Sequence, residues 1–77
     1  MEIIDLRNEY SYKIRHLTNS KNISLYKLLA NPSDYLNKNT DYLLVCEYGI
    51  KSKRVSHILN KMGYHTNSLK GGIKSVK

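Results

Sequence analysis

The sequence predicts a small α/β domain in which helices cover both faces of a parallel sheet. Two observations lead to this prediction. Apolar runs typical of buried strands occur at residues 2–6 and 42–45, and apolar residues recur at helical spacing after residue 52. Strands that alternate with helices along a chain form parallel sheets, and such sheets are normally buried on both faces.

The length of the chain limits it to one core. It has 77 residues, of which 40% are hydrophobic, and a core of this size contributes only a few kcal/mol of net stability. We therefore expect a single domain over residues 1–77. No apolar stretch approaches the roughly 18–20 residues that cross a bilayer, and the acidic start is unlike a signal peptide. These features predict a cytoplasmic protein without a membrane partner, in which a thiol stays reduced.

The first strand is predicted at residues 2–6, where a β-branched run ends in charged residues. Asn8 is then placed to cap a helix, because asparagine side chains accept hydrogen bonds from the free N–H groups of a first helical turn. Tyr10, Ile14 and Leu17 lie at helical spacing, which predicts that this helix buries one apolar face.

The next segment alternates short elements with polar turns. A very short second strand is expected at residues 23–25, followed by a helix at residues 26–30. Pro32 ends this helix, because proline lacks the backbone N–H that would continue it. Residues 37–40 form a polar loop that leads into the central strand.

The second half of the chain holds the clearest pattern. The apolar run at residues 42–45 predicts a buried central strand, and a helix is expected from Ser52. Its apolar positions repeat at i, i+3, i+4 and i+7, namely Val55, Ile58, Leu59 and Met62. Gly63 follows where a left-handed residue commonly ends a helix, and residues 64–69 are expected to supply a last strand.

The only cysteine, Cys46, stands directly after the central strand. A short loop with Gly49 separates it from the helix expected at Ser52, so its sulfur is predicted in front of a helix N-terminus. Free N–H groups and the helix dipole favour an anion there. This position predicts a reactive thiolate rather than an inert buried thiol. His57 and His65 show no metal-ligand spacing with Cys46, so we expect no metal.

Other polar residues are expected near the same edge of the sheet. Ligands of parallel sheets bind at the carboxyl ends of the strands, where Asp5 and Arg7 also fall. These two residues are candidates for ordering the loop or binding an anion, but an ion pair between them is the simpler interpretation. Glu47 is expected to face solvent, because its charge would oppose a neighbouring thiolate. His16 is expected to have a structural hydrogen-bonding role.

The net charge of +7 is concentrated after the cysteine. Residues 1–50 hold six Lys or Arg and all six Asp or Glu, whereas residues 51–77 hold seven Lys or Arg and no acid. Such a surface attracts small anions over long distances. Surfaces that bind nucleic acid usually interleave aromatic with basic residues, and this basic third carries one aromatic residue, Tyr64. We therefore do not expect a nucleic-acid partner.

Three sequence motifs occur in order along nearly the whole chain. They are Ile3-Ile4-Asp5-Leu6-Arg7 followed by Tyr12 and His16-Leu17, then Cys46-Glu47-Tyr48-Gly49-Ile50-Lys51-Ser52, and finally Gly63-Tyr64 with Leu69-Lys70-Gly71-Gly72-Ile73. In this combination the chain resembles the single-domain rhodanese family of sulfurtransferases. The resemblance implies a rhodanese-like fold and the transfer of a sulfane sulfur through a persulfide on Cys46.

The resemblance also implies roles for the site residues. Cys46 would be the catalytic nucleophile, and backbone N–H groups of the loop that follows would hold the anionic persulfide. The loop residues are Glu47, Tyr48, Gly49, Ile50, Lys51 and Ser52. Arg7 and Lys51 would bind a small anionic donor such as thiosulfate, and cyanide or a thiol would accept the sulfur. A protein thiol is a further candidate acceptor, and no cofactor is implied.

Departures from the family pattern leave other interpretations open. Lys51 replaces the usual arginine, which keeps the charge but loses the planar group that holds an oxyanion at two points. Family members also begin earlier, with an extra strand and helix, so the fold is expected to be shortened at its N-terminus. These departures favour, as an alternative, a non-catalytic persulfide carrier or regulatory binding module. Phosphatases and arsenate reductases rank low, because their loop is one residue longer and ends in arginine, whereas Ser52 stands at that position.

Overall fold

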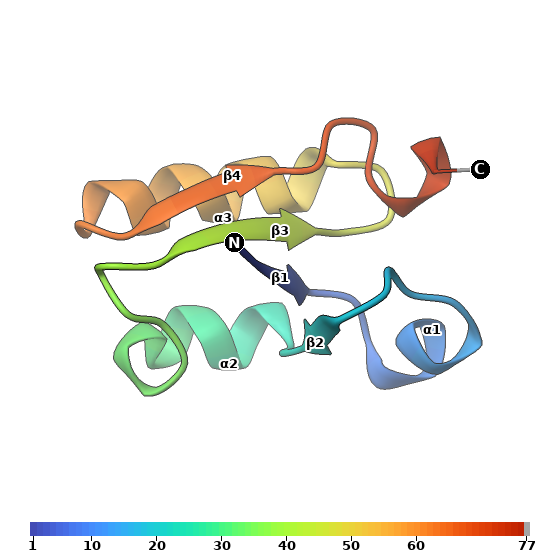
Figure 1. Cartoon of the computed structure of the whole chain (residues 1–77), viewed down its shortest axis with the longest axis horizontal. Helices are drawn as coiled ribbons and strands as arrows, with labels where there is room; N and C mark the ends of the chain where they lie inside the picture. The colour runs from blue at the N-terminus through green and yellow to red at the C-terminus, as the bar shows by residue number, and fades with distance from the viewer. Residues whose placement is uncertain (77) are drawn as a thin grey trace.

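A computed structural model describes residues 1–76 (Figure 1). The strands are β1 (Glu2–Asp5), β2 (Ser20–Asn22), β3 (Asp41–Val45) and β4 (His65–Ser68). The helices are α1 (Glu9–Ile14), α2 (Leu25–Ala30) and α3 (Ile50–Lys61), and two 3₁₀ turns are η1 (Pro32–Asp34) and η2 (Ile73–Ser75). This alternation confirms the predicted α/β class. None of the helices within residues 1–76 combines the length and apolar character needed to cross a membrane.

The four strands form one parallel sheet in the order β2-β1-β3-β4. The central strands β1 and β3 are in register, with Asp5 opposite Val45. All four strands therefore end at the same edge of the sheet, beyond which α1 and η2 lie (Figure 1). Arg7 and Cys46, which follow two of these strands, are brought to that edge together.

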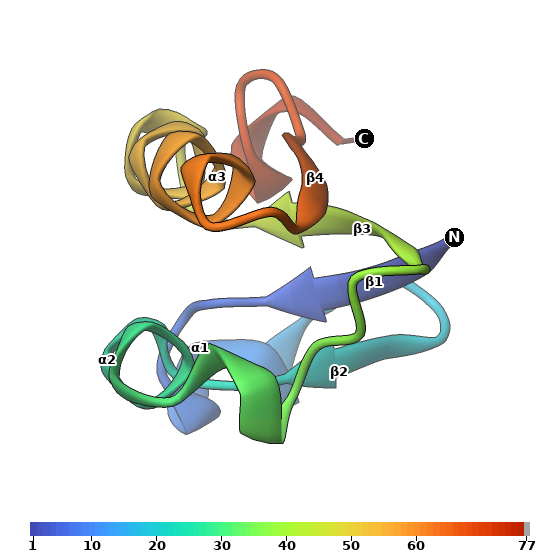
Figure 2. The same cartoon turned by 90° about the vertical axis from the view of Figure 1, so that its left-hand side faces the viewer.

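Two of the helices share one face of the sheet. α2 joins β2 to β3 and α3 joins β3 to β4, so both crossovers run in the same direction across the sheet. Right-handed crossovers in one direction place their helices on one face, and α2 contacts α3 there (Figure 2). α1 belongs to the crossover that runs the other way, and its six residues lie beyond the strand ends. α2 and α3 therefore cover one face of the sheet, and α1 lies past the ends of the strands.

The hydrophobic core lies between this face of the sheet and the two helices. Ile4 of β1 and Leu44 of β3 belong to one buried cluster with Leu28 of α2 and with Val55 and Leu59 of α3. Burying such an aliphatic side chain contributes about 1.5–3 kcal/mol relative to leaving it exposed. This cluster fixes β3 against α3, and therefore also fixes the two ends of the loop between them.

The central strand and the helix after it match the predictions closely. β3 covers the predicted apolar run, and α3 begins at Ile50, two residues before the predicted start. Two of its four predicted apolar positions, Val55 and Leu59, are buried, while the other two are partly exposed. Gly63 has a φ of +99°, which confirms the left-handed residue predicted at the end of this helix.

The second strand does not lie where the sequence predicts it. β2 covers Ser20–Asn22, whereas the predicted strand at residues 23–25 leads into α2. Ser24 caps that helix, because its side chain accepts a hydrogen bond from the Lys27 N–H at 3.2 Å. β2 is a polar edge strand, so no apolar run marks it. The Asn22 side chain anchors it by donating to two backbone carbonyls near the end of β1.

The apolar face predicted for the first helix is wrong. Asn8 caps α1 as expected and accepts a hydrogen bond from the Ser11 N–H at 2.8 Å. Tyr10 and Ile14, however, are 76% and 68% exposed, and none of the six residues of α1 is buried. The helix lies past the strand ends, where no sheet face is available to cover its apolar side chains.

Candidate functional site

Cys46 follows β3 directly and lies at the carboxyl edge of the sheet. The residue is 5% exposed. Its Sγ atom accepts hydrogen bonds from two backbone N–H groups, that of Gly49 at 3.1 Å and that of Ser52 at 3.2 Å. The chain therefore wraps around the sulfur, with N–H dipoles of the loop and of the first turn of α3 directed at it. Such a cradle stabilises negative charge on the sulfur.

Gly49 makes the turn of this loop possible. Its φ of +90° lies in the left-handed region, where residues with a Cβ atom are strained. A Cβ at this position would also lie 2.9 Å from the backbone nitrogen of Gly71. The short loop predicted around Gly49 is therefore a tight turn, and this turn aims the Gly49 N–H at the sulfur.

Ser52 connects the sulfur to a second hydroxyl group. The residue is fully buried, and its Oγ accepts a hydrogen bond from the Cys46 thiol at 3.2 Å. The same Oγ lies 2.6 Å from Oγ of Ser68, the last residue of β4. Ser68 is absent from the predicted site residues, because a serine in a polar edge strand has no distinguishing sequence signal. The structure adds it to the surroundings of Cys46.

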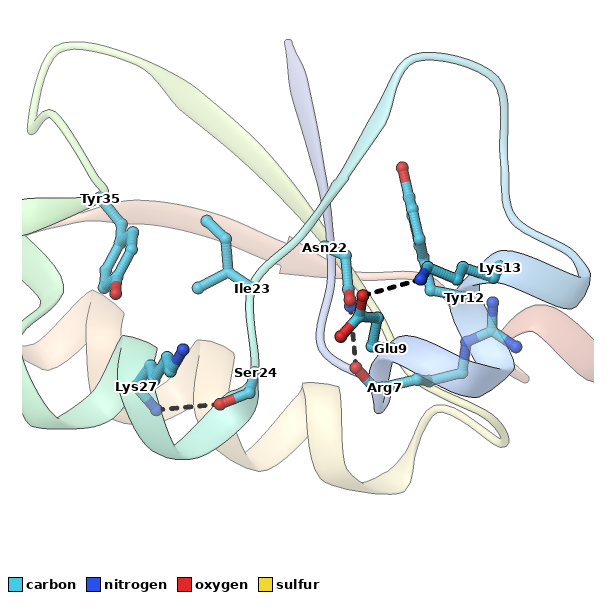
Figure 3. Close-up of a pocket in the computed structure, with 9 residues that line it drawn as sticks. All are labelled: Arg7, Glu9, Tyr12, Lys13, Asn22, Ile23, Ser24, Lys27 and Tyr35. Atoms are coloured by element: carbon cyan, nitrogen blue, oxygen red, sulfur yellow. Dashed lines mark hydrogen bonds and ion pairs between the residues drawn. The ribbon is translucent and has the colours of Figure 1, made fainter.

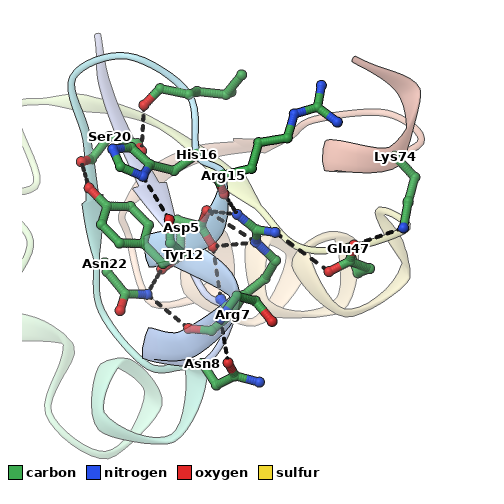
Figure 4. A network of polar contacts seen from close by, with 12 residues as sticks. Asp5, Arg7, Asn8, Tyr12, Arg15, His16, Ser20, Asn22, Glu47 and Lys74 are labelled. Atoms are coloured by element: carbon green, nitrogen blue, oxygen red, sulfur yellow. Dashed lines mark hydrogen bonds and ion pairs between the residues drawn. The ribbon is translucent and has the colours of Figure 1, made fainter. Parts of the chain in front are cut away.

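Asp5 and Arg7 form an ion pair at the end of β1 (Figure 4). Nη2 of Arg7 lies 2.9 Å from Oδ2 of Asp5, Nε donates to Oδ1 at 3.1 Å, and both side chains are buried. Hydrogen bonding to the Asp5 carboxylate raises the pKa of the Arg7 guanidinium, with burial acting in the opposite direction. Arg7 therefore stays charged. Its guanidinium is already engaged by a protein carboxylate, which favours a role in ordering the loop.

Glu47 extends this network to the other end of the chain. Its carboxylate lies 3.6 Å from Nη1 of Arg7 and 3.7 Å from Nζ of Lys74. The side chain is 37% exposed, so it faces solvent only in part. These two cations balance the negative charge of Glu47, which reduces the repulsion between its carboxylate and a thiolate at Cys46. The cysteine loop is thereby held between the end of β1 and η2 (Figure 4).

The segment after β4 braces the cysteine loop through its backbone. The Ile73 N–H donates to the Cys46 carbonyl at 2.9 Å, and the Lys74 N–H donates to the Glu47 carbonyl at 3.1 Å. Gly72 lies so close to the loop that a Cβ there would sit 2.4 Å from the Glu47 carbonyl oxygen. The paired glycines predict a turn but not this contact, because it joins segments that are far apart in the sequence.

The other predicted site residues lie at or near the surface. Tyr48, Ile50 and Lys51 are exposed. The ring of His16 stacks on that of Tyr12 with centroids 3.9 Å apart, and its Nδ1 lies 2.7 Å from the Tyr12 carbonyl oxygen. His16 thus makes local contacts just beyond the end of α1.

A separate cleft of about 520 Å³ opens between α1, β2 and α2 (Figure 3). Tyr12, Lys27 and Tyr35 lie in its wall. Arg7 also lines it, whereas Cys46 does not, so this cleft is not the space in front of the sulfur. Within residues 1–76, no three His, Cys, Asp or Glu side chains are grouped so as to hold a metal ion.

A family model described as the rhodanese-like domain matches residues 1–77. The chain is also 33% identical over 76 residues to the thiosulfate sulfurtransferase GlpE of Coxiella burnetii, over 97% of this chain and 70% of that protein. The chain belongs to the rhodanese-like domain family. This confirms the resemblance carried by the three sequence motifs.

Solved structures of rhodanese-like proteins share this fold. A rhodanese-like domain protein from Staphylococcus aureus matches with a TM-score of 0.88 at 25% identity, over 99% of this chain and 74% of that chain. A rhodanese with anions from E. coli matches with a TM-score of 0.81 at 28% identity, over 97% and 89%.

The chain is also similar to part of a longer relative. The tRNA uridine(34) hydroxylase of Buchnera aphidicola subsp. Baizongia pistaciae is 30% identical to this chain over 77 residues. The match covers 92% of this rhodanese-like chain but 25% of that enzyme. This similarity therefore concerns one part of the hydroxylase.

Proposed function

We propose that this rhodanese-like domain is a sulfurtransferase that carries a sulfane sulfur as a persulfide on Cys46. The observation that carries the proposal is the pair of N–H groups, from Gly49 and Ser52, that donate to Sγ of Cys46. Fixed N–H dipoles stabilise an anionic sulfur without having to reorganise during the reaction. The similarity to a thiosulfate sulfurtransferase supports the same class of reaction.

In the first half-reaction, the Cys46 thiolate attacks the outer sulfur of thiosulfate. A bond forms between Sγ and that sulfur, while the sulfur–sulfur bond of thiosulfate breaks and sulfite leaves with its electron pair. The domain then holds a persulfide whose outer sulfur carries the negative charge. Lys51 adds a positive charge to the loop and attracts the anionic donor.

In the second half-reaction, a soft nucleophile such as cyanide or a thiolate attacks the outer sulfur. The bond from that sulfur to Sγ breaks, and its electron pair returns to Cys46 as the thiolate. With cyanide the product is thiocyanate. The sulfur moves as a neutral atom between nucleophiles, so the reaction needs no oxidant or cofactor. A reducing compartment such as the cytoplasm suits this chemistry, because the thiol stays available there.

Steady-state formation of thiocyanate from thiosulfate and cyanide tests the proposal. The wild-type protein is expected to exceed the uncatalysed rate, and Cys46→Ser is expected to fall to it. Serine nearly preserves the size of the side chain, but its hydroxyl is a far weaker nucleophile toward sulfur. Circular dichroism checks that the variant remains folded. Turnover that survives in a folded Cys46→Ser would refute the mechanism.

A persulfide carrier without efficient turnover is a second candidate. Lys51 favours it, because an exposed lysine holds an anionic donor less firmly than a planar guanidinium does. A carrier would take up one sulfur and keep it, whereas an enzyme would use thiosulfate repeatedly. Lys51→Arg separates the two candidates. A large gain in thiosulfate turnover with this variant supports the carrier, and wild-type turnover that already matches the variant supports the enzyme.

A further inference from the structure

We propose that the surface around Cys46 docks an acidic protein segment whose thiol accepts the sulfur. This inference rests on the proposed function and specifies the partner of the same site. The surface combines two apolar side chains of the cysteine loop with basic side chains beside them. We define this docking surface as Tyr48, Ile50, Arg15, Lys51 and Lys70.

The sulfur is buried, whereas two apolar side chains of the same loop are exposed. Cys46 is 5% exposed, whereas Tyr48 and Ile50 are 64% and 62% exposed. Because Cys46 is so little exposed, an acceptor must reach its sulfur with a narrow group, such as the side chain of a cysteine. The residues around that cysteine can contact the phenol ring and the aliphatic chain, which a small inorganic anion cannot exploit. Aromatic anchors beside a functional centre are typical of protein-binding surfaces.

Basic residues belong to the cysteine loop and to the segments that lie at the same edge of the sheet. Lys51 follows Ile50 in the chain, and Lys70 belongs to the turn whose backbone packs against Gly49. Arg15 follows α1, and its guanidinium donates to the Val76 carbonyl next to η2. Within residues 1–76, none of these three basic residues pairs with a carboxylate.

The carboxylates at this edge are already balanced by other cations. Asp5 is buried against Arg7, and Glu47 lies between Arg7 and Lys74. The exposed charge left on the docking surface is therefore positive. Complementary charge across an interface speeds encounter and selects the partner, so the matching segment is acidic.

The chemistry of sulfur acceptance favours a protein over a nucleic acid. The attacking atom must be a soft nucleophile, and a cysteine thiolate is one whereas unmodified nucleotides contain none. A bond forms between the partner's sulfur and the outer sulfur of the persulfide, and the bond from that outer sulfur to Sγ of Cys46 breaks. The partner leaves as a persulfide and Cys46 returns to the thiolate, with no net oxidation.

Peptide binding tests the docking surface without any sulfur chemistry. The probe is a fluorescent peptide in which Asp, Glu and Leu flank a serine, compared by anisotropy with a matched peptide that carries Asn and Gln instead. We expect the acidic peptide to bind at least about tenfold more tightly at low salt, with an advantage that shrinks at high salt. Equal binding of the two peptides would overturn the proposal.

Single substitutions locate the binding. Lys70→Gln and Arg15→Gln are each expected to weaken binding of the acidic peptide about threefold, because each removes one exposed positive charge. Lys61→Gln removes an equal charge at the far end of α3, about 15 Å from Lys51 along the helix axis, and it should leave binding unchanged. Equal losses in all three variants would show a non-specific effect of net charge and overturn the docking surface.

Sulfur transfer to the cysteine forms of the two peptides completes the test. The persulfide is loaded with polysulfide, and its loss from Cys46 is followed by intact mass. We expect faster discharge to the acidic peptide, while Lys70→Gln discharges to 2-mercaptoethanol at the wild-type rate. Failure of Cys46 to load, with charge-dependent peptide binding intact, would refute the proposed function and still support docking. Tighter binding of an unmodified RNA oligonucleotide would assign the surface to nucleic acid and overturn docking.

Discussion

The backbone N–H of Ser52 donates to Sγ of Cys46 across 3.2 Å, and the Ser52 hydroxyl lies at the same distance from that sulfur. One residue thus gives the sulfur two polar groups, of which only one depends on the side chain. The backbone group is fixed by the first turn of α3, where Ser52 is fully buried. The cradle is therefore expected to survive removal of the hydroxyl.

Ser52→Ala should slow persulfide formation about 2- to 10-fold without abolishing it, because a typical hydrogen bond contributes about 0.5–1.5 kcal/mol. The substitution removes the hydroxyl contacts with Cys46 and Ser68 and leaves the N–H in place. Single-turnover loading from thiosulfate, followed by rapid quench and intact mass, measures the effect. Ser68→Ala removes only the outer hydroxyl and should lose less. Complete loss in a folded Ser52→Ala would contradict the central role of the backbone donors.

Gly72→Ala should destabilise the fold by about 3 kcal/mol or more, since strained backbone and collision add together. Gly72 has φ +65° and ψ −165°, and its added Cβ would lie 2.4 Å from the Glu47 carbonyl oxygen. Gly63→Ala is the matched control, because φ is also positive there but the added Cβ would meet only the Lys38 side chain at 3.5 Å. We expect this control to lose about 1–2 kcal/mol.

Urea denaturation measures the free energy of unfolding of each variant. The rate at which Cys46 takes up sulfur shows whether the cysteine loop keeps its structure. Gly72→Ala should also load more slowly than Gly63→Ala under conditions in which both are folded. Equal destabilisation and equal loading in the two variants would show that Gly72 does not brace the cysteine loop.

Asp5→Asn should destabilise the protein by up to about 5 kcal/mol, because it leaves the buried Arg7 guanidinium with only the more distant Glu47 carboxylate, 3.6 Å away. The matched control is Glu9→Gln, which breaks the exposed Glu9–Lys13 pair and should change stability by at most about 0.5 kcal/mol. Thermal and urea unfolding measure the stability change of each variant. Equal effects of the two substitutions would contradict the importance given to the pair with Arg7.

The pH dependence of this pair follows from the direction of the pKa shift. Asp5 raises the pKa of Arg7, so the contribution of Arg7 to stability is complete below its ordinary pKa. It is lost only as the pH rises through the raised value. Deprotonation of Arg7 should therefore make no contribution to the pH dependence of unfolding at neutral pH.

Lys51→Ala should weaken the use of thiosulfate about 3- to 10-fold and change the use of an uncharged organic polysulfide less, because a nearby unit charge is worth on the order of 1 kcal/mol in solvent. Lys53→Ala removes a charge from the same helix outside the loop and serves as the control. The ratio of kcat/KM for the two donors is the quantity to measure. Equal losses with both donors in Lys51→Ala would exclude a role in attracting the anion.

The sequence is sufficient to predict the elements that bury apolar residues. The run at residues 42–45 is a buried strand that pairs with β1 and β4 and contributes Leu44 to the core under α2 and α3. Gly63 ends α3 because only a residue without Cβ adopts its φ cheaply. The position of Cys46 between this strand and this helix follows from the same local signals.

The remaining features depend on contacts between segments distant in the sequence. The sequence does not predict β2, because Ser20–Asn22 is polar and this strand is held in place by backbone pairing with β1. Tyr10 and Ile14 have the spacing of a buried face, but the topology places α1 beyond the sheet. The contact of Gly72 with the cysteine loop likewise depends on the tertiary fold, which brings the end of the chain against Cys46.

Intact mass after incubation with thiosulfate shows whether Cys46 carries sulfur as a persulfide. We expect the wild-type protein to gain the mass of one sulfur atom, Cys46→Ser to gain none, and cyanide to remove the added sulfur as thiocyanate. Absence of any adduct on the folded wild-type protein, or an equal adduct on Cys46→Ser, would contradict the persulfide on Cys46.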